Sequence, residues 1–115
     1  MEDFDRYRFD VVLLQDAVEF LSGLEEKTRE KVLENIRVSR FKNDPRLLKK
    51  VDKEIWEFRS RYNKQQIRLL AFWDKQSKSL IVCTHGFVKK DQQLPAKELR
   101  RAKNLRTNYL TSKYK

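Results

Sequence analysis

The stretch Leu80-Ile-Val-Cys-Thr-His-Gly-Phe-Val-Lys-Lys90 decides how the rest of the chain is arranged. Its first four residues are apolar and include the β-branched Ile81 and Val82, which favours a strand that is buried on both faces. Such a strand lies inside a sheet, and this one ends in His85, Gly86 and, after two apolar residues, a pair of lysines. The sequence therefore predicts a buried strand that carries positive charge to one edge of a rigid platform.

The composition favours an anionic partner. The chain has 115 residues, enough for one domain with a modest core, and a formal net charge of +10. This charge is typical of proteins that bind nucleic acid, an acidic protein or a membrane surface. It is also segregated, because residues 1–36 carry a net charge of −5, whereas residues 37–68 and 85–115 each carry +7. Segregation of this kind predicts a basic face.

Several classes of protein are not expected. Cys83 is the only cysteine, so no disulfide can form within the chain, and its place in the buried strand favours packing over reactivity. With one His and one Cys, a His/Cys metal site is not expected, and we expect no small-molecule cofactor. The N-terminus is acidic and no apolar run could span a bilayer, so we expect a cytoplasmic protein without a membrane partner.

Hydrophobic spacing predicts an order of one strand, two helices, three strands in a meander and one helix. Ser22 and Glu25 have the spacing of a capping box at the start of the second helix, and Pro95 fits the first position of the last helix. The predicted strands cover residues 6–14, 55–62, 67–73 and 80–90, and the predicted helices cover 16–21, 22–39 and 95–110.

Arginines concentrate on one face of the two middle strands. If Asn63-Lys64 is a two-residue hairpin turn, Arg59 lies opposite Arg68; if the loop has four residues, Arg61 does. Like charges in directly opposed positions destabilise a sheet by a few tenths to about 1 kcal/mol, which is tolerated where an anion binds between them. Glu57 lies on the same face and is an alternative, internal partner for these arginines.

Four other side chains have both a functional and a structural explanation. Lys89 and Lys90 either join the arginines or protect the strand end from edge pairing. His85 has the near-neutral pKa (about 6.5) of a general acid or base, but by alternation it shares the face of Cys83, which favours a buried histidine. Tyr109 either reaches the site with its phenol or packs on the sheet.

Three motifs, in this order, resemble the RelE/HigB toxin superfamily, and its phage-derived HigB-like branch in particular. They are Trp56-Glu57-Phe58-Arg59, Ile67-Arg68-Leu69-Leu70 and His85-Gly86-Phe87-Val88-Lys89-Lys90, followed by the Pro95-led helix. The resemblance covers roughly residues 47–110. It implies one toxin domain over residues 1–115 with an α+β, RelE-like fold: a twisted, mostly antiparallel four-stranded sheet, an N-terminal helical hairpin and a C-terminal helix.

The resemblance also implies a toxin of a type II toxin–antitoxin system that cleaves mRNA on the ribosome and is neutralised by a cognate helix-turn-helix antitoxin. Two departures, Ile67 for the usual Tyr and Asp91 for a Thr or Ser, leave the general acid and base open. The implied catalytic residues are Arg59, Arg68, Lys89, Lys90 and Tyr109, and the candidate RNA-binding residues beside them are Arg61, Lys97 and Arg101.

The residues suit metal-independent RNA cleavage, in which the 2′-OH attacks its own 3′-phosphate and guanidinium groups stabilise the charge on the phosphoryl oxygens. A lysine with a depressed pKa, Tyr109 or His85 is available for proton transfer. Two alternatives stay open: a non-catalytic relative that binds RNA or a protein target, as the gyrase-directed ParE branch does, and a ribosome-associated RNA-binding protein.

Overall fold

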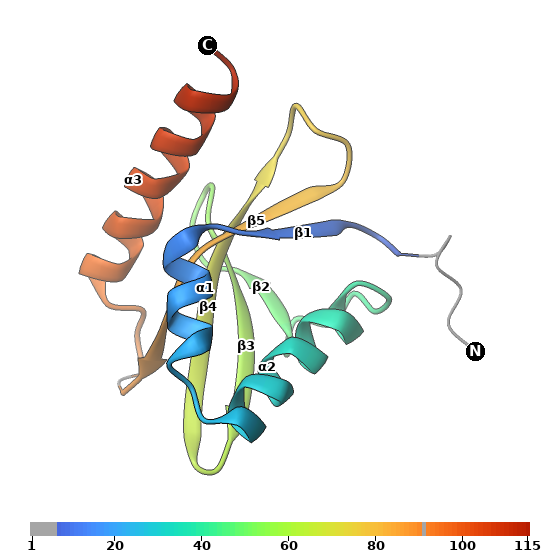
Figure 1. Cartoon of the computed structure of the whole chain (residues 1–115), viewed down its shortest axis with the longest axis vertical. Coiled ribbons are helices and arrows are strands. Elements are labelled where there is room, and N and C mark those ends of the chain that lie inside the picture. The colour runs from blue at the N-terminus through green and yellow to red at the C-terminus, as the bar shows by residue number, and fades with distance from the viewer. Residues whose placement is uncertain (1–6, 91) are drawn as a thin grey trace.

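The computed structural model describes residues 7–90 and 92–115. It is an α+β fold in which helices cover both faces of a mixed five-stranded sheet of order β1-β5-β4-β3-β2 (Figure 1). Only β1 and β5 pair in parallel. The strands are β1 (Asp10–Leu13), β2 (Leu48–Lys50), β3 (Trp56–Tyr62), β4 (Gln65–Asp74) and β5 (Leu80–Lys89), and the helices are α1 (Gln15–Ser22), α2 (Glu26–Ser39) and α3 (Ala96–Lys113).

The predicted four-stranded sheet was wrong by one strand. The additional strand, β2, pairs with residues 56–58 of β3 at the edge of the sheet. Its three residues, Leu48, Lys49 and Lys50, are too few and too charged to show the alternation of a strand. The first predicted strand, 6–14, is shorter than expected, since β1 covers residues 10–13, and Arg6 lies outside the described residues.

The predicted N-terminal helical hairpin differs from the structure. α1 packs mainly on β5 and α2 mainly on β3, so that each helix buries its apolar side against the sheet (Figure 1). The capping box does not form either, because Ser22 is the last residue of α1 and α2 begins at Glu26 without a side-chain cap.

Two apolar clusters show which helix covers which face. One joins Ala17 and Leu21 of α1 and Val32 and Ile36 of α2 to alternate residues of the sheet. The other joins Ala102 of α3 to the opposite face, where the buried sheet residues are Leu70, Phe72, Val82 and Phe87. None of the three described helices is long and apolar enough to cross a membrane.

The stretch that opened the sequence analysis is an interior strand, as predicted. β5 pairs with β1 on one side and β4 on the other, and Cys83 is fully buried, which raises the pKa of its thiol and confirms its packing role. Gly86 lets α1 approach closely, because a Cβ there would lie 2.2 Å from Cδ2 of Phe20. The glycine of the His-Gly-Phe motif therefore sets the contact between α1 and the sheet.

A β-bulge reverses the alternation in the middle of β5. Leu70 pairs with His85 and Ala71 with Cys83, which leaves Thr84 as the extra residue. The Thr84 hydroxyl donates to the Leu70 carbonyl at 3.2 Å. An extra residue moves every following side chain to the other face, so His85 faces α3 rather than sharing the face of Cys83. The predicted face of His85 was therefore wrong, although its predicted burial is confirmed.

Candidate functional site

The β3–β4 hairpin places two arginines directly opposite each other. Asn63 and Lys64 form its two-residue turn with φ values of 50° and 65°, as in the type I′ turns that match strand twist. In this register Arg59 pairs with Arg68, which confirms the first of the two predicted pairings. The Arg59 N–H donates to the Leu47 carbonyl at 2.8 Å and so points away from β4. The pair is therefore a non-hydrogen-bonded one, the kind with Cα atoms only about 4.5 Å apart.

Glu57 lies against both guanidinium groups. Its Oε2 is 3.4 Å from Nε of Arg59, and its Oε1 is 3.6 Å from Nε of Arg68. Glu57 and Arg68 are each only 4% exposed, so their charges depend on each other for compensation. Burial lowers the pKa of Arg68, the charge of Glu57 raises it and the charge of Arg59 lowers it again. One carboxylate shared by two cations leaves a net positive charge at this point of the sheet.

The two arginines keep hydrogen-bonding capacity for a further acceptor. Arg68 donates to the Ile67 carbonyl at 3.1 Å and to Oε1 of Gln66 at 2.9 Å, which fixes its orientation. The Nε atoms of Arg59 and Arg68 are both buried without a hydrogen-bond partner. A buried donor left unsatisfied costs about 1–3 kcal/mol, and such groups often mark a ligand site. The arrangement suits an oxyanion.

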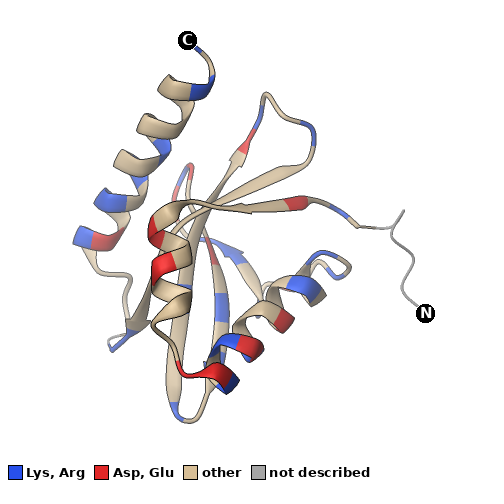
Figure 2. Ribbon diagram, viewed as in Figure 1, with Lys and Arg blue, Asp and Glu red and all other residues tan. Residues whose placement is uncertain are grey.

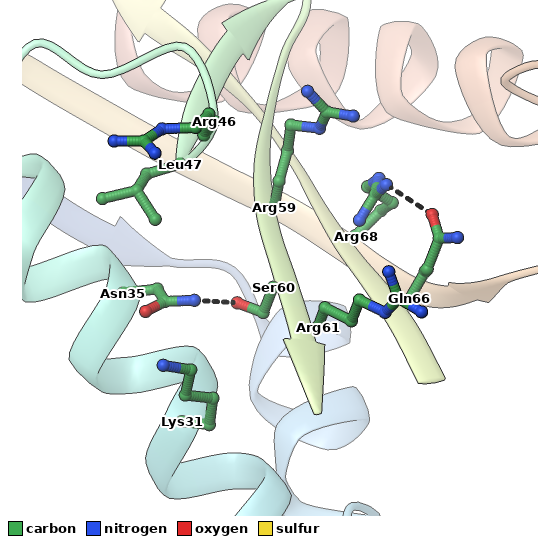
Figure 3. A pocket seen from close by; sticks show the side chains of 9 residues that line it. All are labelled: Lys31, Asn35, Arg46, Leu47, Arg59, Ser60, Arg61, Gln66 and Arg68. Carbon is green, nitrogen blue, oxygen red and sulfur yellow. Dashed lines mark hydrogen bonds between the residues drawn. The ribbon is translucent and has the colours of Figure 1, made fainter. Parts of the chain in front are cut away.

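Two pockets flank the arginine pair. The larger, of about 560 Å³, lies where β3 extends beyond β2, and we call it the edge pocket (Figure 3). Its cationic lining residues are Lys31, Arg46, Arg59, Arg61 and Arg68. The smaller, of about 380 Å³, is lined by Lys89 together with Glu57 and Arg59, and we call it the strand-end pocket. Because Arg59 lines both, the two pockets adjoin.

The predicted site residues separate into two groups. Arg59, Arg68, Lys89 and the exposed Arg61 line one or both pockets. The remaining four do not line either pocket: Lys90, Lys97, Arg101 and Tyr109.

Among these four, the lysines are exposed, and Arg101 is held by Asp16 of α1. Lys90 follows the end of β5 and Lys97 lies in the first turn of α3. Nη2 of Arg101 donates to Oδ2 of Asp16 at 3.0 Å. This ion pair joins α1 to α3, and it gives Arg101 a structural contact that sequence alone could not show.

Tyr109 lies at the other end of β4 from Arg68. Its hydroxyl donates to Oδ2 of Asp74 at 2.9 Å, and its ring packs edge-on against Phe72. Asp74 follows Arg68 by six positions, which is about 20 Å along a strand. The catalytic role expected for Tyr109 is therefore contradicted by its position, because the helix that carries it runs away from the arginines as it crosses the sheet (Figure 1).

His85 is buried beneath the start of α3. Its Nε2 lies 3.3 Å from Oε1 of Glu98 and its Nδ1 lies 3.2 Å from the Thr84 hydroxyl, with 1% of the residue exposed. Burial lowers the pKa of His85, as does the charge of Arg101, whereas Glu98 acts in the opposite direction. A histidine enclosed in this way supports the sheet–helix contact and does not meet a substrate.

Several pocket residues escaped the sequence analysis. Lys49 and Lys50 line the strand-end pocket because β2 pairs with β3, and Lys49 lies opposite Glu57. The basic run over residues 46–53 was the available signal. No sequence signal pointed to Lys31, because it lies in the mainly acidic N-terminal part of the chain.

The helices on the two faces of the sheet differ in charge, most clearly α1 and α3, whereas α2 carries four Lys and Arg residues and three Glu. α1 carries acidic but no basic residues, whereas α3 carries six Lys and Arg residues and one Glu (Figure 2). The residues that face α3 on the sheet include Arg59 and Arg68, so the predicted basic face is the one that α3 partly covers. The described residues contain no cluster of three or more His, Cys, Asp or Glu side chains that could hold a metal ion.

The sequence matches the family model "Phage derived protein Gp49-like (DUF891)" over residues 19–107, well over half of the chain. The chain belongs to the Gp49-like family. This membership confirms the phage-derived branch to which the three motifs pointed.

Among solved structures, this Gp49-like chain is similar to a chain of the archaeal RelE–RelB complex from Pyrococcus horikoshii OT3. The two are 14% identical, with a TM-score of 0.48, and the similarity covers 70% of this chain and 94% of the archaeal one. No curated protein matches the sequence.

Proposed function

We propose that this protein is a toxin of a type II toxin–antitoxin system, a metal-independent endoribonuclease that cleaves mRNA on the ribosome, in the cytoplasm, through one domain over residues 1–115. One observation carries the proposal: Arg59 and the buried Arg68 oppose each other across two strands, and the two guanidinium groups share one carboxylate, that of Glu57. Two like charges held this close destabilise the sheet unless an anion compensates them. A single RNA phosphodiester has the charge and the oxygen atoms to do so.

The reaction is an intramolecular transfer. The ribose 2′-oxygen forms a bond to the adjacent phosphorus, the bond from phosphorus to the 5′-oxygen of the next nucleotide breaks, and the products are a 2′,3′-cyclic phosphate and a 5′-hydroxyl. Arg59 and Arg68 stabilise the charge that develops on the non-bridging oxygens, which is the largest electrostatic demand of this step. A base takes the proton of the 2′-OH and an acid gives one to the 5′-oxygen.

The strand-end pocket supplies groups for both proton transfers. Glu57 is the carboxylate nearest the arginine pair and accepts the 2′-OH proton, while Lys89 lines the same pocket and protonates the leaving oxygen. Glu57 is also bound by the two arginines. An enzyme of this kind depends on the ribosome to hold the mRNA in a reactive conformation.

A non-catalytic relative that binds RNA or a protein target is the second candidate. The observation that favours it is the position of His85 and Tyr109, since neither of these conventional proton-transfer residues lines the pockets. Both candidates share an antitoxin partner, for which we propose a helix-turn-helix protein encoded beside the toxin.

Primer-extension mapping of cellular mRNAs after induction tests the proposal. Wild type should stop growth and produce new 5′ ends within coding regions, and Arg68→Ala should do neither while still co-purifying with the antitoxin. Arg100→Ala is the matched control, because Arg100 is exposed on α3 and lines neither pocket. Undiminished cleavage by Arg68→Ala would contradict the phosphate role, and growth arrest without mRNA cleavage in wild type would favour the binding relative.

A further inference from the structure

We propose that the edge pocket is a second phosphate-binding subsite, which takes the RNA next to the scissile phosphodiester. The inference rests on the proposed function, because it assumes that the arginine pair holds one RNA phosphate. It assigns a substrate-positioning role to Lys31 of α2 and Arg46 of the α2–β2 connection, which lie far from the arginine motifs in sequence.

The edge pocket exists because β2 is short. β2 pairs with residues 56–58 only, so the outer side of β3 has no strand beside it from Ser60 onward. In Figure 3, Lys31, Arg46 and Asn35 lie on one side of this free edge, and Arg61 and Arg68 lie on the other. A single strand of RNA that leaves the arginine pair can therefore cross the edge of the sheet within the pocket.

The backbone of β3 offers a donor at the crossing point. Neighbouring pairs in an antiparallel ladder alternate, so Arg61, like Arg59, belongs to a non-hydrogen-bonded pair with β4. The N–H of Arg59 points outward and reaches the Leu47 carbonyl. The N–H of Arg61 also points outward, where no strand pairs with it. An outward N–H beside cations is a suitable donor for a phosphate oxygen.

The lining favours a polyanion. Five of its nine residues are cations and none is a carboxylate. Lys31 forms no ion pair among the described residues, whereas Arg46 is oriented by Asp44 at 2.9 Å and still exposes most of its guanidinium. Asn35 donates to the Ser60 hydroxyl at 3.2 Å and gives the pocket a polar floor. The alternative occupant is an acidic peptide that pairs as a strand with the free edge of β3. The cationic side chains on both sides of this edge favour RNA over such a peptide.

The test measures how affinity depends on the number of phosphates. The probes are a 2′-O-methyl dinucleotide with one internal phosphate and a 2′-O-methyl tetranucleotide with three, neither of which has a 2′-OH that can attack. We expect Lys31→Ala/Arg46→Ala to weaken tetranucleotide binding by about tenfold and dinucleotide binding by less than about twofold. For the tetranucleotide, the slope of the logarithm of the binding constant against the logarithm of the salt concentration should become less steep by about 1.4, or about 0.7 for each lost phosphate contact.

The control is Lys27→Ala/Lys78→Ala, which removes the same charge from two exposed residues outside both pockets. If the two double variants bind the tetranucleotide equally well, the proposed phosphate subsite is contradicted. It is also wrong if Lys31→Ala/Arg46→Ala weakens only the complex with the antitoxin, which would make the pocket a peptide site. Failure of the proposed function gives a different result, since Arg68→Ala would then bind the dinucleotide as well as wild type does.

Discussion

Each end of β4 carries a buried charged side chain on the same face of the sheet, and the two charges are compensated to different degrees. At one end Arg68 faces Arg59, and the Nε atoms of the two arginines share the Glu57 carboxylate at 3.6 and 3.4 Å. At the other end Asp74 is 1% exposed and accepts hydrogen bonds from Tyr109, Tyr114 and Lys113.

The two ions differ in how completely their charge is compensated. Burial works to raise the pKa of Asp74, but the hydrogen bonds from Tyr114, Lys113 and Tyr109 outweigh it and lower the pKa to about 2. The Asp74 end therefore holds the last turns of α3 on the sheet and needs no ligand. The Arg68 end keeps a surplus of positive charge, because two guanidinium groups share one carboxylate.

The largest expected effect is on cleavage by Arg68→Met, which keeps most of the side-chain volume and removes the charge. We expect cleavage to fall by at least about 100-fold, as for loss of one transition-state donor. The free energy of unfolding should fall by about 1–3 kcal/mol, less than the loss of about 3–5 kcal/mol typical of breaking a buried ion pair, because Glu57 keeps Arg59 as its partner. Cleavage rates in a translation extract and urea unfolding measure the two effects. A loss of several kcal/mol in stability would show that Arg68 is a structural ion like Asp74.

At the opposite end, Asp74→Asn should reduce stability and spare activity. The amide keeps the shape of the carboxylate and one acceptor oxygen, but it removes the charge that Lys113 and the two tyrosine hydroxyls share and puts an NH2 donor in place of the second oxygen. We expect a loss of about 2–4 kcal/mol in the free energy of unfolding and less than a twofold change in cleavage by the folded protein. Urea titration and the extract assay again report the outcome, and a large loss of cleavage would place Asp74 in the functional site.

Acid should unfold the protein partly through the same carboxylate. The pKa of Asp74 is about 2 in the folded state and near 4 when unfolded, so the unfolded state binds the proton more readily. The stabilisation from this group is complete above about pH 4 and is lost as the pH falls towards 2. Stability measured from pH 6 to pH 2 should show a smaller loss over this interval in Asp74→Asn than in wild type. Parallel curves would exclude Asp74 as the titrating group.

Tyr109→Phe should have the smallest effect and tests the rejected catalytic role. The ring remains packed on Phe72, and two hydrogen bonds are lost: the one that the hydroxyl donates to Asp74 and the one that it accepts from Lys113, which keeps Asp74 as its partner. We expect stability to fall by about 1 kcal/mol and cleavage to stay within about twofold of wild type. A loss of cleavage comparable to that of Arg68→Met, at unchanged stability, would return Tyr109 to the catalytic residues.

Local patterns predicted most of the fold and the centre of the site. Alternation placed β3, β4 and β5, and the turn residues Asn63 and Lys64 permitted the register that pairs Arg59 with Arg68. The basic charge of the second half of the chain predicted a basic site, and cationic side chains line both pockets beside these arginines.

Other features depended on contacts that no local pattern contains. β2 is a strand only because β3 is beside it, and the bulge at Thr84 moves His85 to the α3 face. Tyr109 was assigned to the arginines because helical spacing gives a face of α3 but not the point on the sheet that each turn meets. Lys31 reached the edge pocket through the packing of α2 on β3.

The sequence by itself determined the family, the main strands and the two opposed arginines, because motif order, alternation and turn chemistry are properties of neighbouring residues. Only the tertiary structure decided which buried ions have their charge fully compensated and which keep a surplus of charge. That distinction depends on distances between side chains from separate elements, as between Asp74 and the end of α3 or between Glu57 and the two arginines.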